Sequence, residues 1–200
     1  MMRQSKVRIL AECAMMLALS IALSFVVLYE MPWGGAVTLL SMLPVMLVSI
    51  RHGLKWGLTT SFLYAWFQAL QGKAFSLGGV SPRFLIASLL LDYLVAFTVL
   101  GLAGAFRRFG RSGCLCGIVL AATLRFASHF LSGVFLWANF EEFVVFGASF
   151  YNRPVLYSLL YNLAYMLPET LLTVAGAVAL FFVPQAKRLI VQGSDLRLDK

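Results

Sequence analysis

The stretch RFASHFLSGVFLWANF, residues 125–140, carries chemically distinct side chains at a regular spacing inside an otherwise apolar run. Arg125, His129, Gly133 and Trp137 recur every four residues. In an α-helix each such step turns about 400°, so the four residues form one slowly turning stripe. A charged group in an apolar helix is costly and normally faces a partner or a cavity. The stripe is therefore a candidate binding surface.

The composition places this stripe in a membrane. Of 200 residues, 61% are hydrophobic and 12% are charged, whereas soluble domains have about 25% charged residues. A helix needs about 20 apolar residues to cross the hydrocarbon layer. We therefore expect a single domain, residues 1–200, that is an all-α, multi-pass protein of the cytoplasmic membrane. It is predicted to be a bundle of six transmembrane helices, at about residues 9–29, 36–50, 54–71, 84–106, 113–137 and 158–183.

Basic residues gather in alternate connections between the expected helices. The N-terminal segment, residues 51–55, residues 107–111 and the segment after residue 183 hold twelve of the sixteen Lys and Arg residues. Because cytoplasmic segments carry an excess of Lys and Arg, both termini are expected in the cytoplasm. Topology and lipid headgroups account for the net charge of +8, and no basic patch with interleaved aromatic residues indicates nucleic-acid binding.

Other polar and aromatic residues are expected in the outer half of the bundle, beside the stripe. They are Trp33 in the first outer loop, Asp92 and Tyr93 in the fourth helix, and Tyr157 and Asn162 in the sixth. Each one alone has an ordinary explanation, such as an aromatic belt at the membrane interface. Together they predict a pocket open to the outside. Aromatic faces attract a delocalised cation and a buried carboxylate offsets its charge, so a flat organic cation fits best.

Arg125 lies one turn deeper than His129 and has a structural interpretation. It is expected to pair with a buried acid, either Asp92 or Glu169, which lies near the middle of the sixth helix. His129 taken alone is better explained as a core histidine that is bonded to a backbone carbonyl. The functional interpretation therefore depends on whether these side chains converge.

Motifs for metal, cofactor and nucleotide chemistry are missing from the sequence. Cys13, Cys114 and Cys116 are odd in number, and the Cys-Leu-Cys pair has no third ligand nearby, so we expect neither a disulfide nor a metal site. No phosphate-binding P-loop is present, because Gly72-Lys73 is followed by Ala74. The energy for any transport must then come from a source other than a P-loop of this chain, and no cofactor is expected.

At these residues the sequence resembles the thiamin-specific substrate-binding component, or S component, of energy-coupling factor (ECF) vitamin transporters. The resemblance covers nearly the whole chain. Its segments are GGAVTLLSMLPVMLVSIRHGLKWG after the first helix, LDYLVAFTVLGLAGAF in the fourth, RFASHFLSGVFLW in the fifth and YSLLYNLAYMLPE in the sixth. The pattern H-x3-G-x3-W, followed about 20 residues later by Y-S-L-x-x-N, is its most specific part.

The resemblance implies a site, a ligand and partners. It places Trp33, Asp92, Tyr93, His129, Gly133, Trp137, Tyr157 and Asn162 around thiamin, with Gly133 leaving room for the vitamin, and it suggests Phe75 as a further ring-stacking residue. The family usually has glutamate where this chain has Asp92, which alters the geometry of the expected salt bridge. The implied partners are a transmembrane coupling subunit and two cytoplasmic ATPases.

The first helix offers a surface for such a coupling subunit. Ala14, Ala18 and Ala22 recur every four residues, and small side chains at this spacing let another helix approach closely. The alternative is that these alanines pack only within the bundle.

Rival functions remain open at this point. A thiamin precursor or another vitamin would suit a similar pocket. A secondary carrier coupled to protons through Asp92 or Glu169 is less attractive, because six helices without a repeat are unusual for that class. An intramembrane hydrolase would need E-E-x-x-x-R, and Phe146 occupies the arginine position after Glu141-Glu142. We therefore expect a transporter component and no enzyme.

Overall fold

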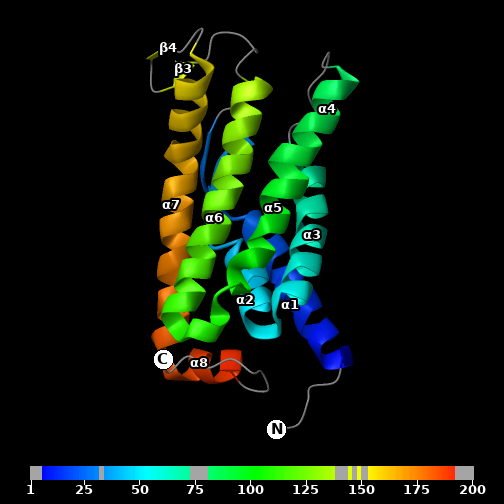
Figure 1. The fold of residues 1–200 in the computed structure, drawn as a ribbon, viewed down its shortest axis with the longest axis vertical. Helices are drawn as coiled ribbons and strands as arrows, with labels where there is room; N and C mark the ends of the chain where they lie inside the picture. Colours follow the sequence, from blue (N-terminus) through cyan, green and yellow to red (C-terminus); the bar gives the residue numbers. More distant parts are fainter. Residues whose placement is uncertain are drawn as a thin grey trace.

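The apolar runs of the sequence form long helices that lie side by side in a bundle (Figure 1). The computed structural model describes residues 6–31, 34–72, 81–137, 144–145, 148–149 and 153–191. In chain order its elements are α1 (Lys6–Ser24), β1 (Val27–Glu30), β2 (Ala36–Thr38), α2 (Leu43–His52), α3 (Leu54–Gln71), α4 (Pro82–Ser88), the π-helical segment η3 (Leu89–Val95), α5 (Ala96–Thr98), the 3-10 segments η4 (Val99–Gly104) and η5 (Arg107–Phe109), α6 (Gly110–Phe135), β3 (Val144–Val145), β4 (Ala148–Ser149), α7 (Pro154–Phe182) and α8 (Pro184–Val191).

The predicted all-α bundle is confirmed. The segments α4, η3, α5 and η4 follow one another directly and make one long helical rod, so the six main helices are α1, α2, α3, this rod, α6 and α7. Among the residues that the structure describes, three stretches are long and apolar enough to cross a membrane: Lys6–Ser24, Pro82–Phe135 and Pro154–Phe182. The second stretch contains both the rod and α6, which pack against each other.

The first two predicted helices were wrong in their limits. The helix expected at 9–29 ends at Ser24, and the chain then forms β1, which pairs antiparallel with β2. The second predicted helix, 36–50, is β2 at its beginning and becomes helical only at Leu43, with Pro44 in the first turn. A helix of ten residues spans only about 15 Å, which is too short to cross the hydrocarbon layer.

The later predictions need smaller changes. The helix predicted at 54–71 agrees with α3. The rod begins at Pro82, where the Ser81 side chain accepts a hydrogen bond from the backbone N–H of Phe84, and its last segment ends at Gly104. In place of 113–137 and 158–183, α6 begins at Gly110 and α7 at Pro154. The short helix α8 was not predicted.

Glycines let the rod lie directly against α2 at the centre of the bundle. The hydroxyl of Ser49 accepts a hydrogen bond from the Gly104 N–H at 3.0 Å and donates one to the carbonyl of Gly101. A Cβ atom at Gly104 would come within 2.3 Å of the Ser49 carbonyl oxygen, so only glycine fits. This contact fixes the rod, which carries Asp92, relative to the rest of the bundle.

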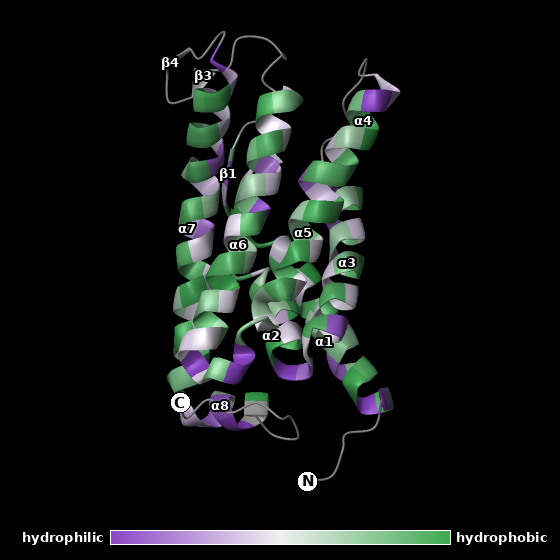
Figure 2. Cartoon of the chain, viewed as in Figure 1, coloured by the Kyte–Doolittle hydropathy of each residue, from purple (hydrophilic) through white to green (hydrophobic). Residues whose placement is uncertain are grey.

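Hydrophilic residues are concentrated at the ends of the bundle, and most residues in its middle are hydrophobic (Figure 2). The start of α1, the junction of α2 with α3, and α8 all lie at one end (Figure 1). At this end Arg107 donates hydrogen bonds to the carbonyls of Ile50 and Arg51, at 3.2 and 3.0 Å. The described parts of the basic segments therefore lie at the same end, which is the distribution expected for a cytoplasmic face.

Candidate ligand-binding site

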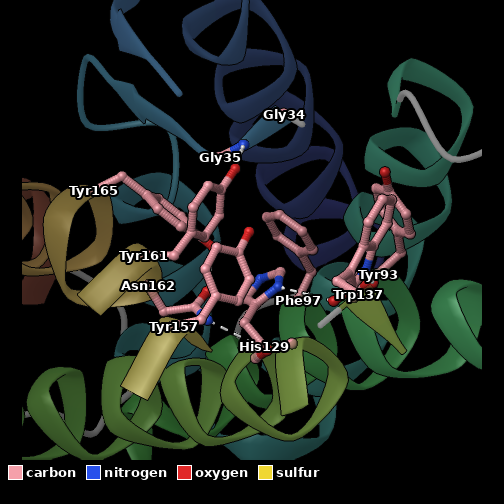
Figure 3. A pocket seen from close by; sticks show the side chains of 12 residues that line it. Gly34, Gly35, Tyr93, Phe97, His129, Trp137, Tyr157, Tyr161, Asn162 and Tyr165 are labelled. Carbon is pink, nitrogen blue, oxygen red and sulfur yellow. Dashed lines mark hydrogen bonds and ion pairs between the residues drawn. The ribbon is translucent and has the colours of Figure 1, made fainter. Parts of the chain in front are cut away.

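A pocket opens between the rod, α6, α7 and the segment before β2, in the half of the bundle away from the basic end (Figures 1 and 3). Figure 3 shows its aromatic side chains around His129. The lining residues are Gly34, Gly35, Asp92, Tyr93, Phe97, His129, Gly133, Trp137, Tyr157, Tyr161, Asn162 and Tyr165. Seven of the nine sequence-predicted site residues are among them. The other two, Trp33 and Phe75, lie outside the described residues.

The π-helical segment η3 carries the acidic residue of the pocket. Asp92 lies in its first turn, and its carboxylate is bonded from three directions. The Ser88 hydroxyl donates to Oδ2 at 2.8 Å, the Trp137 indole N–H donates to Oδ2 at 2.9 Å, and His129 Nδ1 lies 3.3 Å from Oδ1. Wide turns of this kind are common at functional sites. The carboxylate is thereby fixed at the pocket wall.

Tyr93, the next residue of η3, also lines the pocket. Its ring packs closely against the end of α3, where a Cβ atom at Gly72 would come within 2.0 Å of the Tyr93 hydroxyl. A glycine at position 72 is therefore needed for this ring position.

His129 stands at the centre of the pocket and is held by aromatic rings. Its ring meets Phe97 edge to face at 6.2 Å and Tyr165 at 6.3 Å between centroids. One ring nitrogen contacts Asp92, and the other, Nε2, is buried with no hydrogen-bond partner in the part of the chain that the structure describes. A buried polar atom without a partner is unfavourable unless a ligand or water meets it.

A row of tyrosines on α7 forms another wall. Tyr157, Tyr161 and Tyr165 follow at intervals of four, with ring centroids 5.6 and 5.8 Å apart. The Tyr161 hydroxyl accepts a hydrogen bond from the Gly35 N–H at 3.2 Å. Only Tyr157 was predicted from the sequence, although the spacing of four placed the other two tyrosines on the same face.

Asn162 and Gly133 join α6 to α7 beside this wall. The Asn162 amide donates to the His129 carbonyl of α6 at 3.4 Å and to the Ser158 carbonyl of α7 at 2.8 Å, and its oxygen accepts from the Tyr165 hydroxyl at 3.0 Å. A Cβ atom at Gly133 would lie 2.2 Å from the Ser158 hydroxyl. Gly133 therefore allows α6 and α7 to approach closely, in addition to lining the pocket.

Comparisons with known proteins decide the family. The family model described as thiamine transporter protein matches residues 10–190. The chain belongs to this thiamine transporter family. The thiamine transporter ThiT of Bacillus subtilis (strain 168) is 32% identical over 205 residues, which cover 94% of this chain and 97% of that protein. A solved structure of ThiT from Listeria monocytogenes has the same fold, with a TM-score of 0.68, 23% identity, and coverage of 92% of this chain and 98% of that one.

Membership of the thiamine transporter family agrees with the apolar helices of the bundle. The chain is a multi-pass protein of the cell membrane. The relatives are named as transporters, so the family is one of transport proteins rather than enzymes.

A buried ion pair lies directly beneath the pocket. Arg125 on α6 and Glu169 on α7 are 3.0 Å apart, and their side chains are 7% and 3% exposed. Glu169 also accepts a hydrogen bond from Thr38 at 2.7 Å, and the Arg125 guanidinium lies 4.6 Å from the centre of the Phe97 ring. Of the two acids predicted as partners of Arg125, Glu169 forms the ion pair, and Asp92 lines the pocket instead.

The open volume of the pocket is about 90 Å³, which is small beside the roughly 300–1,000 Å³ of typical ligand sites. A drug-sized ligand therefore needs side chains to move. Trp137 is well placed to do so, because it lies two residues beyond the end of α6 and its indole N–H donates to one oxygen of Asp92. Ligand binding would then exchange the indole for a group of the ligand.

The buried pair leads to a prediction about stability. Arg125→Gln leaves the Glu169 carboxylate unpaired, and removing one partner of a buried pair costs about 3–5 kcal/mol. We expect a fall of this size in the free energy of unfolding of the purified protein. The double variant Arg125→Met, Glu169→Met removes both charges and should recover most of the loss, because apolar replacement of a buried pair is often nearly neutral. Losses that simply add in the double variant would contradict the pairing.

Proposed function

We propose that this chain binds thiamin with high affinity and takes it up across the cytoplasmic membrane, as the substrate-specific S component of an ATP-driven ECF transporter. The observation that carries the proposal is the Asp92 carboxylate, 13% exposed, in a pocket walled by aromatic rings. Thiamin is a flat organic cation, and a desolvated carboxylate beside aromatic faces favours this class of ligand. The names of the relatives support the same ligand.

The predicted site residues have proposed roles in this binding. Asp92 is the counter-ion of the thiazolium ring. His129 offers its unpartnered Nε2 as a hydrogen-bond acceptor or donor, and Asn162 fixes the wall against which the ligand is oriented. Trp137 and Tyr157 supply aromatic faces, and Trp33 and Phe75 are proposed to complete the cage.

We further propose that thiamin enters from outside the cell and that both termini are cytoplasmic. The pocket lies away from the end that gathers the basic residues, as Figures 1 and 2 show for the elements concerned. An excess of Lys and Arg marks the cytoplasmic side. No enzymatic step is part of this proposal, because transport requires only binding and release.

ATP-driven coupling needs a surface for a partner subunit, and α1 provides a suitable one. Ala14, Ala18 and Ala22 are exposed along α1, whereas Cys13, Ser20 and Ser24 on its other side are buried. Small residues let two helices approach closely in a membrane. The exposed alanines support the proposal that a transmembrane coupling subunit, bound to two cytoplasmic ATPases, docks here.

The ligand is tested by tryptophan fluorescence of the purified protein. We expect saturable quenching by thiamin, because Trp137 must leave Asp92 when the cation binds. Thiamin precursors measured in the same way will show which part of the molecule is recognised. Quenching by neutral riboflavin or anionic biotin, with none by thiamin, would disprove the assignment.

The charge of Asp92 is tested by a nearly isosteric substitution. Asp92→Asn removes the counter-ion, and loss of one partner of a desolvated charge pair costs about 2–5 kcal/mol, so thiamin affinity should fall by about 30-fold or more. Asp92→Glu keeps the charge, and Glu30→Gln removes an acid outside the pocket lining. Calorimetry should find thiamin binding by both of these variants. Unchanged affinity in Asp92→Asn would show that the carboxylate is not the counter-ion.

The coupling surface is tested by separating binding from transport. Ala14→Leu and Ala18→Leu block close helix approach and leave the pocket untouched, so thiamin binding by the isolated protein should persist while ATP-driven uptake falls about tenfold or more. Ala127→Leu makes the same change at an exposed position of α6 and serves as the control. Uptake that is insensitive to cytosolic ATP but collapses with the membrane potential would instead indicate a secondary carrier.

A further inference from the structure

A second cavity lies at the basic end of the bundle, far from the ligand pocket, between α1, α2 and α8. Its volume is about 240 Å³. The lining residues are Arg8, Glu12, Met16, Leu47, Val48, Arg51, His52 and Ile190. The proposed thiamin site uses none of them, so this cavity requires its own explanation.

One part of the cavity wall is charged. Glu12 on α1 lies 3.2 Å from Arg8 Nε, 2.9 Å from Arg51 Nε and 2.8 Å from His52 Nε2. Two guanidinium groups thus face one carboxylate among the lining residues, so the wall is positive even when His52 is neutral. The Arg8 side chain is 58% exposed and can turn toward a bound anion.

The other part of the wall is apolar. Met16 comes from α1, Leu47 and Val48 from α2, and Ile190 from α8. Ile190 is only 9% exposed and belongs to the main hydrophobic core, so α8 is anchored against the bundle beside the cavity. The cavity therefore offers a cationic surface and an apolar surface side by side.

We propose that this cavity binds an anionic phospholipid of the cytoplasmic leaflet, with the phosphate near Arg8 and Arg51 and the first part of an acyl chain against Met16 and Leu47. Charge complementarity supports this occupant, because basic pockets between transmembrane helices on the cytoplasmic side bind anionic headgroups. The combination with an apolar wall favours a lipid over free phosphate. The inference rests on the proposed orientation of the protein and is independent of its proposed ligand.

A bound lipid would contact all three elements that meet at this end. Arg51 and His52 of α2 link this helix to α1 through Glu12, and α8 packs against α2 and α7. An anionic lipid in the cavity would therefore stabilise the position of α1, whose exposed alanines are the proposed coupling surface. Lipid composition would then affect the coupling end of the protein without touching the outer pocket.

The test is lipid binding to the purified full chain, measured by native mass spectrometry. Phosphatidylglycerol should bind at least about tenfold more tightly than phosphatidylcholine with the same acyl chains. In the double variant Arg8→Gln, Arg51→Gln, affinity for phosphatidylglycerol should fall by about 30-fold, as expected for two basic side chains at an anionic surface. Lys55→Gln removes a basic residue at the same end but outside the cavity, and should change binding less than twofold.

A second variant covers the case in which the arginine substitutions unfold the protein. Met16→Trp fills the cavity and keeps every charge, so phosphatidylglycerol binding should fall while the unfolding temperature is retained. Equal binding of the two lipids, or equal losses in Lys55→Gln and the arginine variant, would overturn the proposal. Displacement of the lipid by millimolar inorganic phosphate would point to a free anion. Loss of coupling-subunit binding in the arginine variant, with unchanged lipid binding, would point to a protein surface. Displacement by phosphate and this loss would each overturn the proposal as well.

Discussion

The Arg125–Glu169 ion pair is the constraint on which the rest of the structure depends, because two charges held away from water must satisfy each other. The pair ties α6 to α7 at 3.0 Å, and Glu169 reaches Thr38 at the end of β2. The Phe97 ring of the rod lies against the Arg125 guanidinium, with 4.6 Å between the guanidinium carbon and the ring centroid. The same ring lines the pocket and contacts the His129 ring edge to face. The floor of the ligand site is thus built from a structural charge pair covered by an aromatic ring, and the charge of Arg125 is compensated before a ligand arrives.

Above this floor Asp92 is the carboxylate that lines the pocket, and it is the proposed counter-ion of the ligand. Asp92 is bonded to Ser88, His129 and Trp137, and the glycine-mediated contact of the rod with α2 fixes the backbone that carries it. Arg125 is paired with Glu169 below the pocket, and the described lining residues include no arginine. Asp92 is therefore not paired with an arginine among them. The separation of the two acids, one structural and one facing the pocket, follows from their different partners. It supports the proposal that the ligand of this site is a cation.

Much of this arrangement could be predicted from the sequence, and the missing parts have physical reasons. Hydropathy predicted the six helices, but β1 follows directly on the first apolar run and β2 begins the second, and hydropathy alone does not separate such short strands from helix. The π-helical turn at Asp92 depends on a shift of backbone hydrogen bonds that has no clear sequence signal. Tyr161 and Tyr165 were overlooked although their spacing of four from Tyr157 placed them on the same face. The choice of Glu169 over Asp92 as the partner of Arg125 required the three-dimensional structure.

The central claim is that Asp92 recognises the positive charge of thiamin. The most direct test compares thiamin with an uncharged analogue of the same shape, in which a thiophene replaces the thiazolium ring, by calorimetric titration of the unmodified protein and of Asp92→Asn. We expect the unmodified protein to prefer thiamin by about 30-fold or more, as the cost of an unpaired desolvated charge requires, and the variant to bind the two compounds with similar affinity. Equal binding of both compounds by the unmodified protein, or an undiminished preference in the variant, would contradict the account.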